Sequence, residues 1–379
     1  MACSSAGIAL SSFVDPIGDA GFEAELLGAL DGWQGLSWAA AQCRGIDAEL
    51  RLGAAAYEQV DRLGADLHDL LAGGLGAAPA FAHAAAVLAR TGDPVRAAEA
   101  IVADDPELAD LLVTALGIPG LLHAVGAALP DGHGVVRDTG RDGVGVAGRP
   151  PRSLTGLLKD LARRNGDARH GEIDVRILTL PDGSRRAIVD ITGTKSWDPL
   201  PTSDVTSLTT NGRALVGEST AYEQGVLAAM RRAGVRKTDD VMLVGHSEGG
   251  MVAVTTARDA VASGQFNVTH VVTAGAPIAL TVGSLPTGVQ VLALENGRDV
   301  VPHLDGRANP DEPNITTVTS YHGDGTITGD HDIAGSYVPL ARDVQASDNG
   351  SIRDFLGSAR RYFQATTVET HTFQVQRGY

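Results

Sequence analysis

Aromatic residues are scarce in this chain of 379 residues, where Phe, Trp and Tyr together make up 4% of the sequence. Because 43% of the residues are hydrophobic, a core has to be built mainly from Ala, Val, Leu and Ile. Cysteine is equally rare. Cys3 and Cys43 are the two present, and two thiols do not make a disulfide framework. The composition is that of an ordinary globular protein.

Long hydrophobic runs and excess positive charge are also missing. The sequence has no uninterrupted apolar stretch of about 18 residues, so no membrane span is expected. The first residues, MACSSAGIALSSFV, lack the basic stretch that opens a signal peptide. These absences favour a cytoplasmic protein, or one exported by a route that reads no such peptide. The formal net charge of −16 argues against nucleic acid and anionic membranes as partners.

The length and patterning of the chain predict two domains. Residues 1–130 are expected to form an all-α domain, since apolar residues recur there at helical spacing. Residues 131–151 are rich in Gly, Pro, Asp and Arg, which predicts a linker. They contain G-x-G-x-x-G from Gly143 to Gly148, but without the flanking strand and helix of a dinucleotide site, so no cofactor is predicted. Residues 152–379 alternate strands and helices, which predicts an α/β domain with a largely parallel sheet.

Two helices of the N-terminal region flank the tripeptide Trp33-Gln34-Gly35, and the second helix contains YEQVD from Tyr57 to Asp61. This arrangement, over about residues 20–72, resembles the helical hairpins of WxG-type substrates of type VII secretion. Tyr57 and Asp61 match their Y-x-x-x-D/E export signal. The resemblance implies export by the type VII machinery, which would then be a partner. On the residues alone, Trp33 caps a hairpin core and Tyr57 faces a neighbouring helix.

The stretch VMLVGHSEGGMVAV, from Val241 to Val254, places one serine between an apolar strand and a helix of small residues. Residues 245–249 match the G-x-S-x-G nucleophile elbow, with Ser247 at its centre. Glycines on both sides of the serine let strand and helix approach without a Cβ clash. The chain has 47 glycines, so the pattern alone is weak. The strand before it and the helix after it give it weight.

The segments around the elbow alternate in type. Pro181 to Ser184 has strong turn chemistry and predicts a hairpin between its flanking strands. The pattern predicts helices at 153–165, 219–233 and 351–364, and strands at 173–180, 186–191, 269–273, 289–294 and 315–320. The long polar segment from Pro199 to Gly217 is a candidate cover for a pocket, and Trp197 is a candidate for its wall.

A serine hydroxyl needs a base to accept its proton and donors to hold the developing oxyanion. In the chain order of α/β hydrolases, an acid follows the serine and a histidine follows the acid. Asp299 follows the strand 289–294, with Glu295 as its competitor. His322 and His331 both follow the strand 315–320, so the residues leave two candidates for the base.

Five ordered motifs resemble those of the class 3 lipases, an α/β-hydrolase family, over about residues 173–340. The motifs are Gly193-Thr194, Gly245–Gly250, Val272–Pro277, Asp299–Pro302, and His331 ahead of Tyr337. The resemblance implies Ser247 as nucleophile, His331 as general base and acid, and Asp299 as the residue that orients the imidazole. It also implies the backbone N–H groups of Thr194 and Glu248 as oxyanion donors, with the Thr194 hydroxyl as a further candidate.

Other polar residues near these motifs are interpreted as follows. Glu248 stands where the family more often has an uncharged residue, and its side chain is expected to turn away from the pocket. His303 and Asp305 are candidates for the pocket wall. His331 lies among three carboxylates whose spacing matches no calcium loop, so no metal is predicted. The three are Asp324, Asp330 and Asp332.

The sequence therefore predicts a serine hydrolase that cleaves carboxylic esters of small molecules or lipids through an acyl-enzyme. Acyl transfer and thioester hydrolysis need the same residues and stay open as alternatives. In a third alternative, the N-terminal helical region carries the main function of the protein. The protein would then be a type VII secretion substrate or interaction module whose hydrolase fold is subordinate or degenerate.

Overall fold

The computed structural model describes residues 78–140, 148–167, 169–196 and 203–379, which belong to one compact unit. Several sequence predictions fall outside these residues and stay predictions. They concern the WxG-like hairpin with Trp33 and Tyr57, the cysteines Cys3 and Cys43, the first two glycines of the G-x-G-x-x-G pattern, and Trp197.

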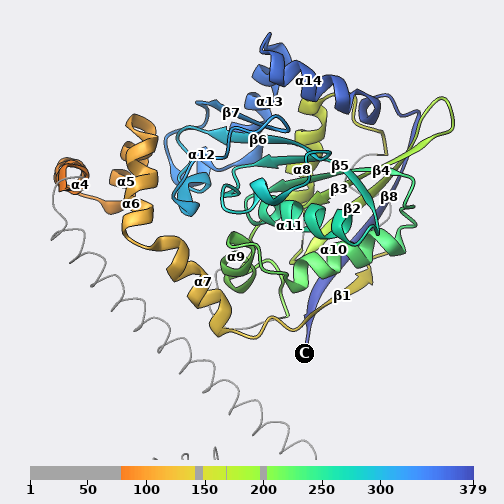
Figure 1. Cartoon of the computed structure of the whole chain (residues 1–379), viewed down its shortest axis with the longest axis horizontal. Helices are drawn as coiled ribbons and strands as arrows, with labels where there is room; N and C mark the ends of the chain where they lie inside the picture. Colours follow the sequence, from red (N-terminus) through yellow and green to blue (C-terminus); the bar gives the residue numbers. More distant parts are fainter. Residues whose placement is uncertain (1–77, 141–147, 168, 197–202) are drawn as a thin grey trace, which may run out of the picture. The chain divides into compact units, whose positions relative to one another are not determined.

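An eight-stranded sheet forms the centre of this unit (Figure 1). Its spatial order is β1-β8-β2-β3-β4-β5-β6-β7, in which β3 to β7 run parallel and the other pairs are antiparallel. The strands are β1 (His133–Asp138), β2 (Glu172–Thr179), β3 (Arg185–Ile191), β4 (Asp240–His246), β5 (Asn267–Ala274), β6 (Gln290–Asn296), β7 (Ile315–Ser320) and β8 (Thr367–Gly378). The carboxyl ends of the parallel strands meet at one edge, where sites form in open α/β sheets.

Helices cover both faces of the sheet. One face carries α10 (Ala221–Arg232) and α11 (Glu248–Ala262), and the other carries α8 (Leu154–Asp167), α13 (Val338–Ala346) and α14 (Gly350–Ala359). Successive side chains of a strand point to opposite faces, so a strand buried on both faces is apolar throughout. The four residues 241–244 of β4 follow this rule, alternating between the two core clusters.

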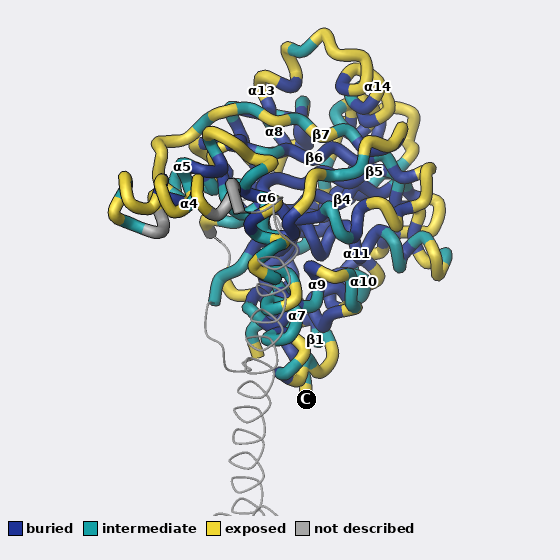
Figure 2. The backbone as a smooth tube through the Cα atoms, turned by 60° about the vertical axis from the view of Figure 1, so that its left-hand side comes forward, coloured by how far each residue is buried: buried dark blue, intermediate teal, exposed yellow. Residues whose placement is uncertain are grey.

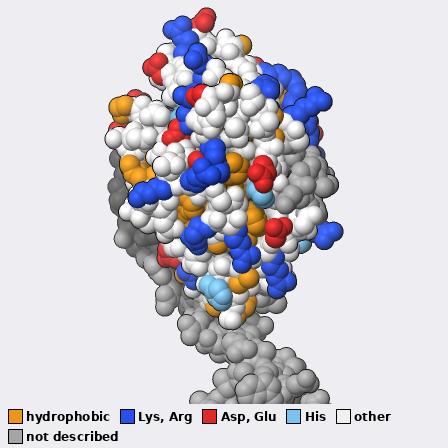
Figure 3. All heavy atoms as spheres, turned by 90° about the vertical axis from the view of Figure 1, so that its right-hand side faces the viewer, with side chains coloured by type: hydrophobic (Ala, Val, Ile, Leu, Met, Phe, Trp, Pro, Cys, Tyr) orange, Lys and Arg blue, Asp and Glu red, His pale blue; other side chains and the backbone are white. Residues whose placement is uncertain are grey.

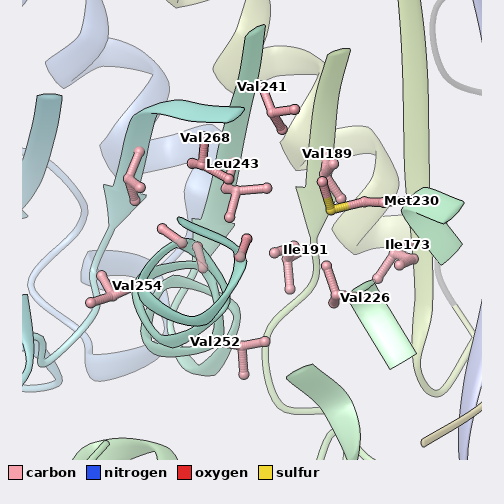
Figure 4. Packing of buried hydrophobic residues seen from close by; sticks show 14 of the residues in the cluster. Ile173, Val189, Ile191, Val226, Met230, Val241, Leu243, Val252, Val254 and Val268 are labelled. Atoms are coloured by element: carbon pink, nitrogen blue, oxygen red, sulfur yellow. The ribbon is translucent and has the colours of Figure 1, made fainter. Parts of the chain in front are cut away.

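Aliphatic side chains fill this core, as the shortage of aromatic residues requires. In Figure 4, Val226 and Met230 of α10 lie against Ile173 of β2 and Val189 of β3, and all four belong to one buried cluster. Figure 2 shows that the buried backbone is concentrated in the central strands, whereas α4 is largely exposed.

Buried ion pairs join α8 to the sheet. Arg164 lies 2.9 Å from Asp174 of β2, and Arg176 of the same strand lies 3.0 Å from Asp160 of α8 and 2.8 Å from Asp190 of β3. Buried charges are tolerated when they are paired in this way. The pairs hold the end of α8 near the end of β3, where the functional residues gather.

Four helices precede the sheet: α4 (Ala78–Thr91), α5 (Pro94–Asp104), α6 (Pro106–Ala115) and α7 (Ile118–Ala128). Helix α6 begins at Asp105, whose carboxylate accepts a hydrogen bond from the Leu108 N–H at 3.0 Å. The described helices are not a separate domain, because they share one compact unit with the sheet. A Cβ on Gly212 of α9 (Leu208–Leu215) would meet the Leu122 carbonyl of α7 at 2.1 Å, so the two helices touch through their backbones.

The predicted linker 131–151 contains a strand. Residues 133–138 form β1, which pairs antiparallel with β8 at the edge of the sheet. The linker prediction was wrong for these six residues. The run from Gly134 to Val136 is too short to indicate a strand by itself, and the strand forms because it pairs with the distant β8. Within the described residues, the other helices and strands predicted after residue 152 are present within a few residues of their expected bounds, whereas β8, α9 and α13 were not predicted.

Charge is distributed over the surface. On the face shown in Figure 3, Lys and Arg side chains are spread among acidic and neutral ones. Individual arginines pair locally, as Arg185 does with Asp239 at 3.3 Å. In the part of the chain that the structure describes, no single helix is long and apolar enough to cross a membrane. Helices α6 and α7 meet that criterion of length and composition only as a pair bent by 52°.

Close packing at the start of α11 predicts the effect of adding one methyl group. A Cβ on Gly249 would lie 2.3 Å from the Ile191 carbonyl oxygen and 2.7 Å from that of Thr192, and backbone atoms cannot move aside. We expect Gly249→Ala to lower the free energy of unfolding by about 1–3 kcal/mol in urea titrations. The control is Gly357→Ala in α14, where a Cβ would meet nothing within 4 Å. The control should be at least as stable as the wild type, and equal stability of both variants would contradict the packing argument.

Buried carboxyl groups predict that stability falls as pH rises. Asp305 is buried, and burial raises its pKa from 3.8 to about 7. Because the folded state holds this proton more tightly than the unfolded chain does, the associated stability is complete below pH 3.8 and is lost as pH rises through about 7.

We therefore expect the melting temperature to fall between pH 5 and pH 8.5, and to fall less in Asp305→Asn. The amide oxygen can still accept the Ala279 N–H, which now lies 2.7 Å from Asp305 Oδ2. Asp311→Asn, at an exposed position, is the matched control and should follow the wild-type curve. Identical pH dependence in all three proteins would refute this assignment.

Candidate active site

Ser247 occupies the tight turn between β4 and α11. Its φ of 56° and ψ of −128° make it the one residue other than glycine with positive φ among the described residues. Such backbone conformations are costly and cluster at functional sites. The Ser247 N–H donates to the Ala274 carbonyl at 2.9 Å, which ties the turn to the end of β5. A Cβ on Gly245 would meet the Gly249 carbonyl oxygen at 2.1 Å, so the predicted glycines are required by backbone contact.

The structure brings Asp299 and His331 together, as the sequence predicts. Asp299 Oδ2 lies 2.6 Å from His331 Nδ1, and the carboxyl group is fully buried. Its Oδ1 accepts the Val301 N–H at 2.9 Å, and its Oδ2 also accepts the Tyr337 hydroxyl at 2.5 Å. With Nδ1 donating to the carboxylate, Nε2 of the imidazole is the nitrogen that can accept a proton.

The competing acid and base are engaged elsewhere. Glu295 accepts a hydrogen bond from the Asn309 side chain at 2.6 Å. His322 Nε2 lies 2.6 Å from Asp343 Oδ2 in an exposed pair. Among the described side chains, Asp299 is therefore the carboxylate that His331 contacts, and His322 belongs to a different pair.

Two further residues were expected to line the pocket and do not. His303 Nδ1 binds Asp110 of α6 at 2.7 Å, and Asp305 accepts the Ala279 N–H. Both residues belong to the 3₁₀ turn η2 (Pro302–Asp305), and Leu304 lies between them. The turn directs Leu304 to the cavity in place of His303 and Asp305, so the prediction for these two residues was wrong.

The carboxylates around His331 stabilise turns. Asp324 Oδ1 accepts the Thr326 N–H at 3.0 Å, Asp330 Oδ1 accepts the Gly325 N–H at 2.9 Å, and Asp332 Oδ2 accepts the Gly335 N–H at 2.6 Å. In the described parts of the chain, no group of His, Cys, Asp and Glu side chains is arranged to hold a metal ion. The cluster thus shapes the loop that carries His331.

A cavity of about 410 Å³ opens at this edge of the sheet, and Ser247 and His331 both line it. Helix α9 lies within the segment predicted as a pocket cover and contributes Leu208, Asn211 and Leu215. The remaining apolar wall comes from α7, α11 and the loops after β5, β6 and β7. Its residues are Leu122, Met251, Pro277, Val301, Leu304, Ile327 and Ile333. No sequence pattern marks Leu122, 125 residues before the serine, as part of the site.

His246 and Asn296 brace the loop that carries His331. His246 Nε2 lies 2.9 Å from the His331 carbonyl oxygen, and the two rings are 4.5 Å apart between centroids. Burial lowers the pKa of His246 well below its ordinary value, so this ring is neutral. The Asn296 amide donates to the carbonyls of Asp330 at 2.7 Å and His322 at 3.0 Å. Asn296 was not predicted, although its place at the carboxyl end of β6 marks the edge at which the site lies.

The loop Gly193-Thr194 follows β3 and lies directly against the serine. A Cβ on Gly193 would be 2.9 Å from the His246 carbonyl oxygen and 3.1 Å from Ser247 Cβ. The Gly193 N–H donates to Asn165 Oδ1 of α8 at 3.2 Å. The backbone N–H groups of Thr194 and Glu248 stay candidates for an oxyanion site.

The Thr194 hydroxyl is already engaged and does not fit the further role considered for it. It donates to Glu248 Oε2 at 2.7 Å and accepts from the Asn211 side chain at 2.9 Å. The Glu248 carboxyl group is fully buried, and burial raises its pKa well above the ordinary value. Glu248 is therefore directed at the Thr194 hydroxyl and favours the neutral acid.

Comparison with known proteins supports the α/β fold. A family model described as a PGAP1-like alpha/beta domain matches residues 211–326, which include Ser247 and Asp299 and end before His331. A search of curated proteins found no match to the chain. The match supports neither the WxG resemblance of residues 20–72 nor a specific assignment to the class 3 lipases. The predicted α/β fold is confirmed, and the chain contains an α/β-hydrolase-type domain similar, over these residues, to the lipase-related PGAP1-like domain.

Proposed function

We propose that the protein is a serine hydrolase that cleaves carboxylic esters through an acyl-enzyme on Ser247. The observation that carries the proposal is the 2.6 Å hydrogen bond between Asp299 and His331 beside the cavity that Ser247 also lines. A buried acid, a histidine and a serine on a strained turn are the groups that nucleophilic acyl transfer requires.

In the proposed reaction, Ser247 Oγ attacks the ester carbonyl carbon while its proton moves to His331 Nε2. Asp299 stabilises the imidazolium that forms. The negative charge on the carbonyl oxygen is held by the Thr194 and Glu248 N–H groups. His331 then gives the proton to the departing alkoxide, which leaves as the alcohol and leaves the acyl group on Ser247. A water molecule, deprotonated by His331, releases the carboxylic acid and restores the serine.

Tyr337 supports the charge on Asp299 in this scheme. Burial, followed by the neighbouring Asp299 carboxylate, raises the pKa of Tyr337 well above its ordinary value, so the phenol stays a hydrogen-bond donor. The Val301 N–H and His331 are the other donors to the same carboxyl group. These three donors satisfy the buried Asp299 carboxyl group and fix its orientation towards His331.

The walls of the cavity favour an apolar acyl group. Leucine, methionine, valine and isoleucine side chains surround the space next to Ser247, and cavities of this size enclose small organic ligands. The substrate class that fits is an ester of a hydrophobic carboxylic acid. We therefore propose testing p-nitrophenyl esters of increasing acyl length.

The first test removes the nucleophile. Ser247→Ala should lower kcat for p-nitrophenyl ester hydrolysis by more than about 10⁴-fold, because it removes the hydroxyl that forms the acyl-enzyme. It should also abolish labelling by a fluorophosphonate probe. Ser351→Ala, at an exposed position in α14, is the control and should keep both properties. Substantial hydrolysis by a folded Ser247→Ala protein would refute the proposal.

The second test compares each proposed residue with its rival. Asp299→Asn should lower kcat by about 10³- to 10⁴-fold, since the buried acid orients His331, whereas Glu295→Gln should have little effect. His331→Ala should lose activity to a similar degree, whereas His322→Ala should keep it. Steady-state kinetics on the four variants, with circular dichroism to check folding, make this comparison. If either rival variant lost more activity than its partner, the assignment would be wrong.

A further inference from the structure

No step of the proposed reaction uses the carboxyl group of Glu248. Its backbone N–H belongs to the proposed oxyanion site, but its side chain is fully buried and accepts the Thr194 hydroxyl at 2.7 Å. Burying a carboxyl group away from water is unfavourable. The buried side chain of Glu248 is therefore expected to have a structural or functional role that offsets this cost.

Thr194 is the point at which two elements hold the oxyanion loop. Its hydroxyl donates to Glu248 at the start of α11 and accepts from Asn211 of α9 at 2.9 Å. Because a hydroxyl has one hydrogen, these two bonds fix the Thr194 side chain. The backbone of residues 193–194 is held in place as well, because it packs closely against His246 and Ser247.

Helix α9 is itself anchored by the last strand. Arg377 of β8 donates to the hydroxyls of Ser207 at 3.1 Å and Thr210 at 2.9 Å, at the start of α9, and to the Asp204 carbonyl. A continuous set of hydrogen bonds therefore runs from β8 through α9 to Thr194 and Glu248. Such a network gives Asn211 a defined position from which to hold the Thr194 hydroxyl.

We propose that Glu248 is a positioning residue, whose buried carboxyl group holds the Thr194 hydroxyl and thereby keeps the Thr194 N–H aimed at the oxyanion. The inference rests on the proposed ester hydrolysis at Ser247. It assigns the side chain of Glu248 no contact with the substrate. Because the raised pKa of this group favours the neutral acid, the hydrogen bond to Thr194 adds no negative charge beside the oxyanion.

The test separates positioning from general stability. Glu248→Leu removes the acceptor, so the Thr194 N–H is no longer held, and kcat should fall about a hundredfold while KM changes less than about threefold. Glu248→Gln keeps an acceptor oxygen and should recover most of the lost rate. Thr256→Val removes a buried hydroxyl from the same helix, away from the cavity, and should leave kcat unchanged.

Thr194 tests the same bond from the other side, and serves if Glu248→Leu does not fold. Thr194→Val should match the loss in Glu248→Leu, and Thr194→Ser should recover most of the rate. The double variant Glu248→Leu/Thr194→Val should lose no more than either single variant, because both remove one interaction. Additive losses, or a wild-type kcat in Thr194→Val, would overturn the inference.

The outcomes also separate this inference from the proposed function. If the wild-type protein neither hydrolyses esters nor reacts with a fluorophosphonate at Ser247, the proposed function fails and the inference fails with it. If the wild-type protein is active and Ser247→Ala is not, the function stands. Unchanged kcat in the folded Glu248 and Thr194 variants would then reject the positioning role alone.

Discussion

The geometry of the site depends on how closely the first turn of α11 approaches the neighbouring strands. Glycines allow that approach: Gly249 touches the Ile191 carbonyl of β3, and a Cβ on Gly250 would meet Ala276 at 2.5 Å. In the turn that this approach allows, Ser247 adopts its positive φ of 56°. The first N–H groups of a helix have no intrahelical acceptor four residues before them, so the Glu248 N–H at the start of α11 is a candidate donor beside the serine.

The buried charge of Asp299 depends on donors that separate parts of the chain supply. His331, Tyr337 and the Val301 N–H come from different segments and converge on one carboxyl group. His246, next to the serine, holds the main chain of His331 in turn. The serine, the acid and the base are thus connected through the protein and not only through a substrate. A buried carboxylate would be unstable without these bonds, so the acid and its donors have to be ordered together.

Sequence patterns predicted the elements whose signals are local. The elbow strand is a continuous apolar run, Asp299 follows the apolar strand β6, and His331 follows β7, ITTVTS, which is rich in β-branched residues. Position after a predicted strand does not separate Asp299 from Glu295 or His331 from His322. The motif resemblance favoured Asp299 and His331, and the distances show that these two side chains lie together. Strand β1 was missed because it is short and pairs with β8 from the opposite end of the chain. Helix α9, LTTNGRAL, has Thr, Asn and Gly at its centre, and forms where Gly212 packs on α7 despite low helix propensity.

The unpredicted elements α9 and β8 support the part of the site that the sequence analysis did not explain, which is the contact between Glu248 and Thr194. The carboxylate of Glu248 looked unfavourable beside an oxyanion, yet burial and the Thr194 hydroxyl give it a neutral form with a partner. Asn211 of α9 is the second partner of that hydroxyl, and Arg377 of β8 anchors the start of α9. The loop closest to the serine is therefore held from two elements that local patterns do not reveal. A residue at the carboxyl end of the chain can act on the site only because the sheet brings β8 beside β2, and a pattern along the sequence contains no such information.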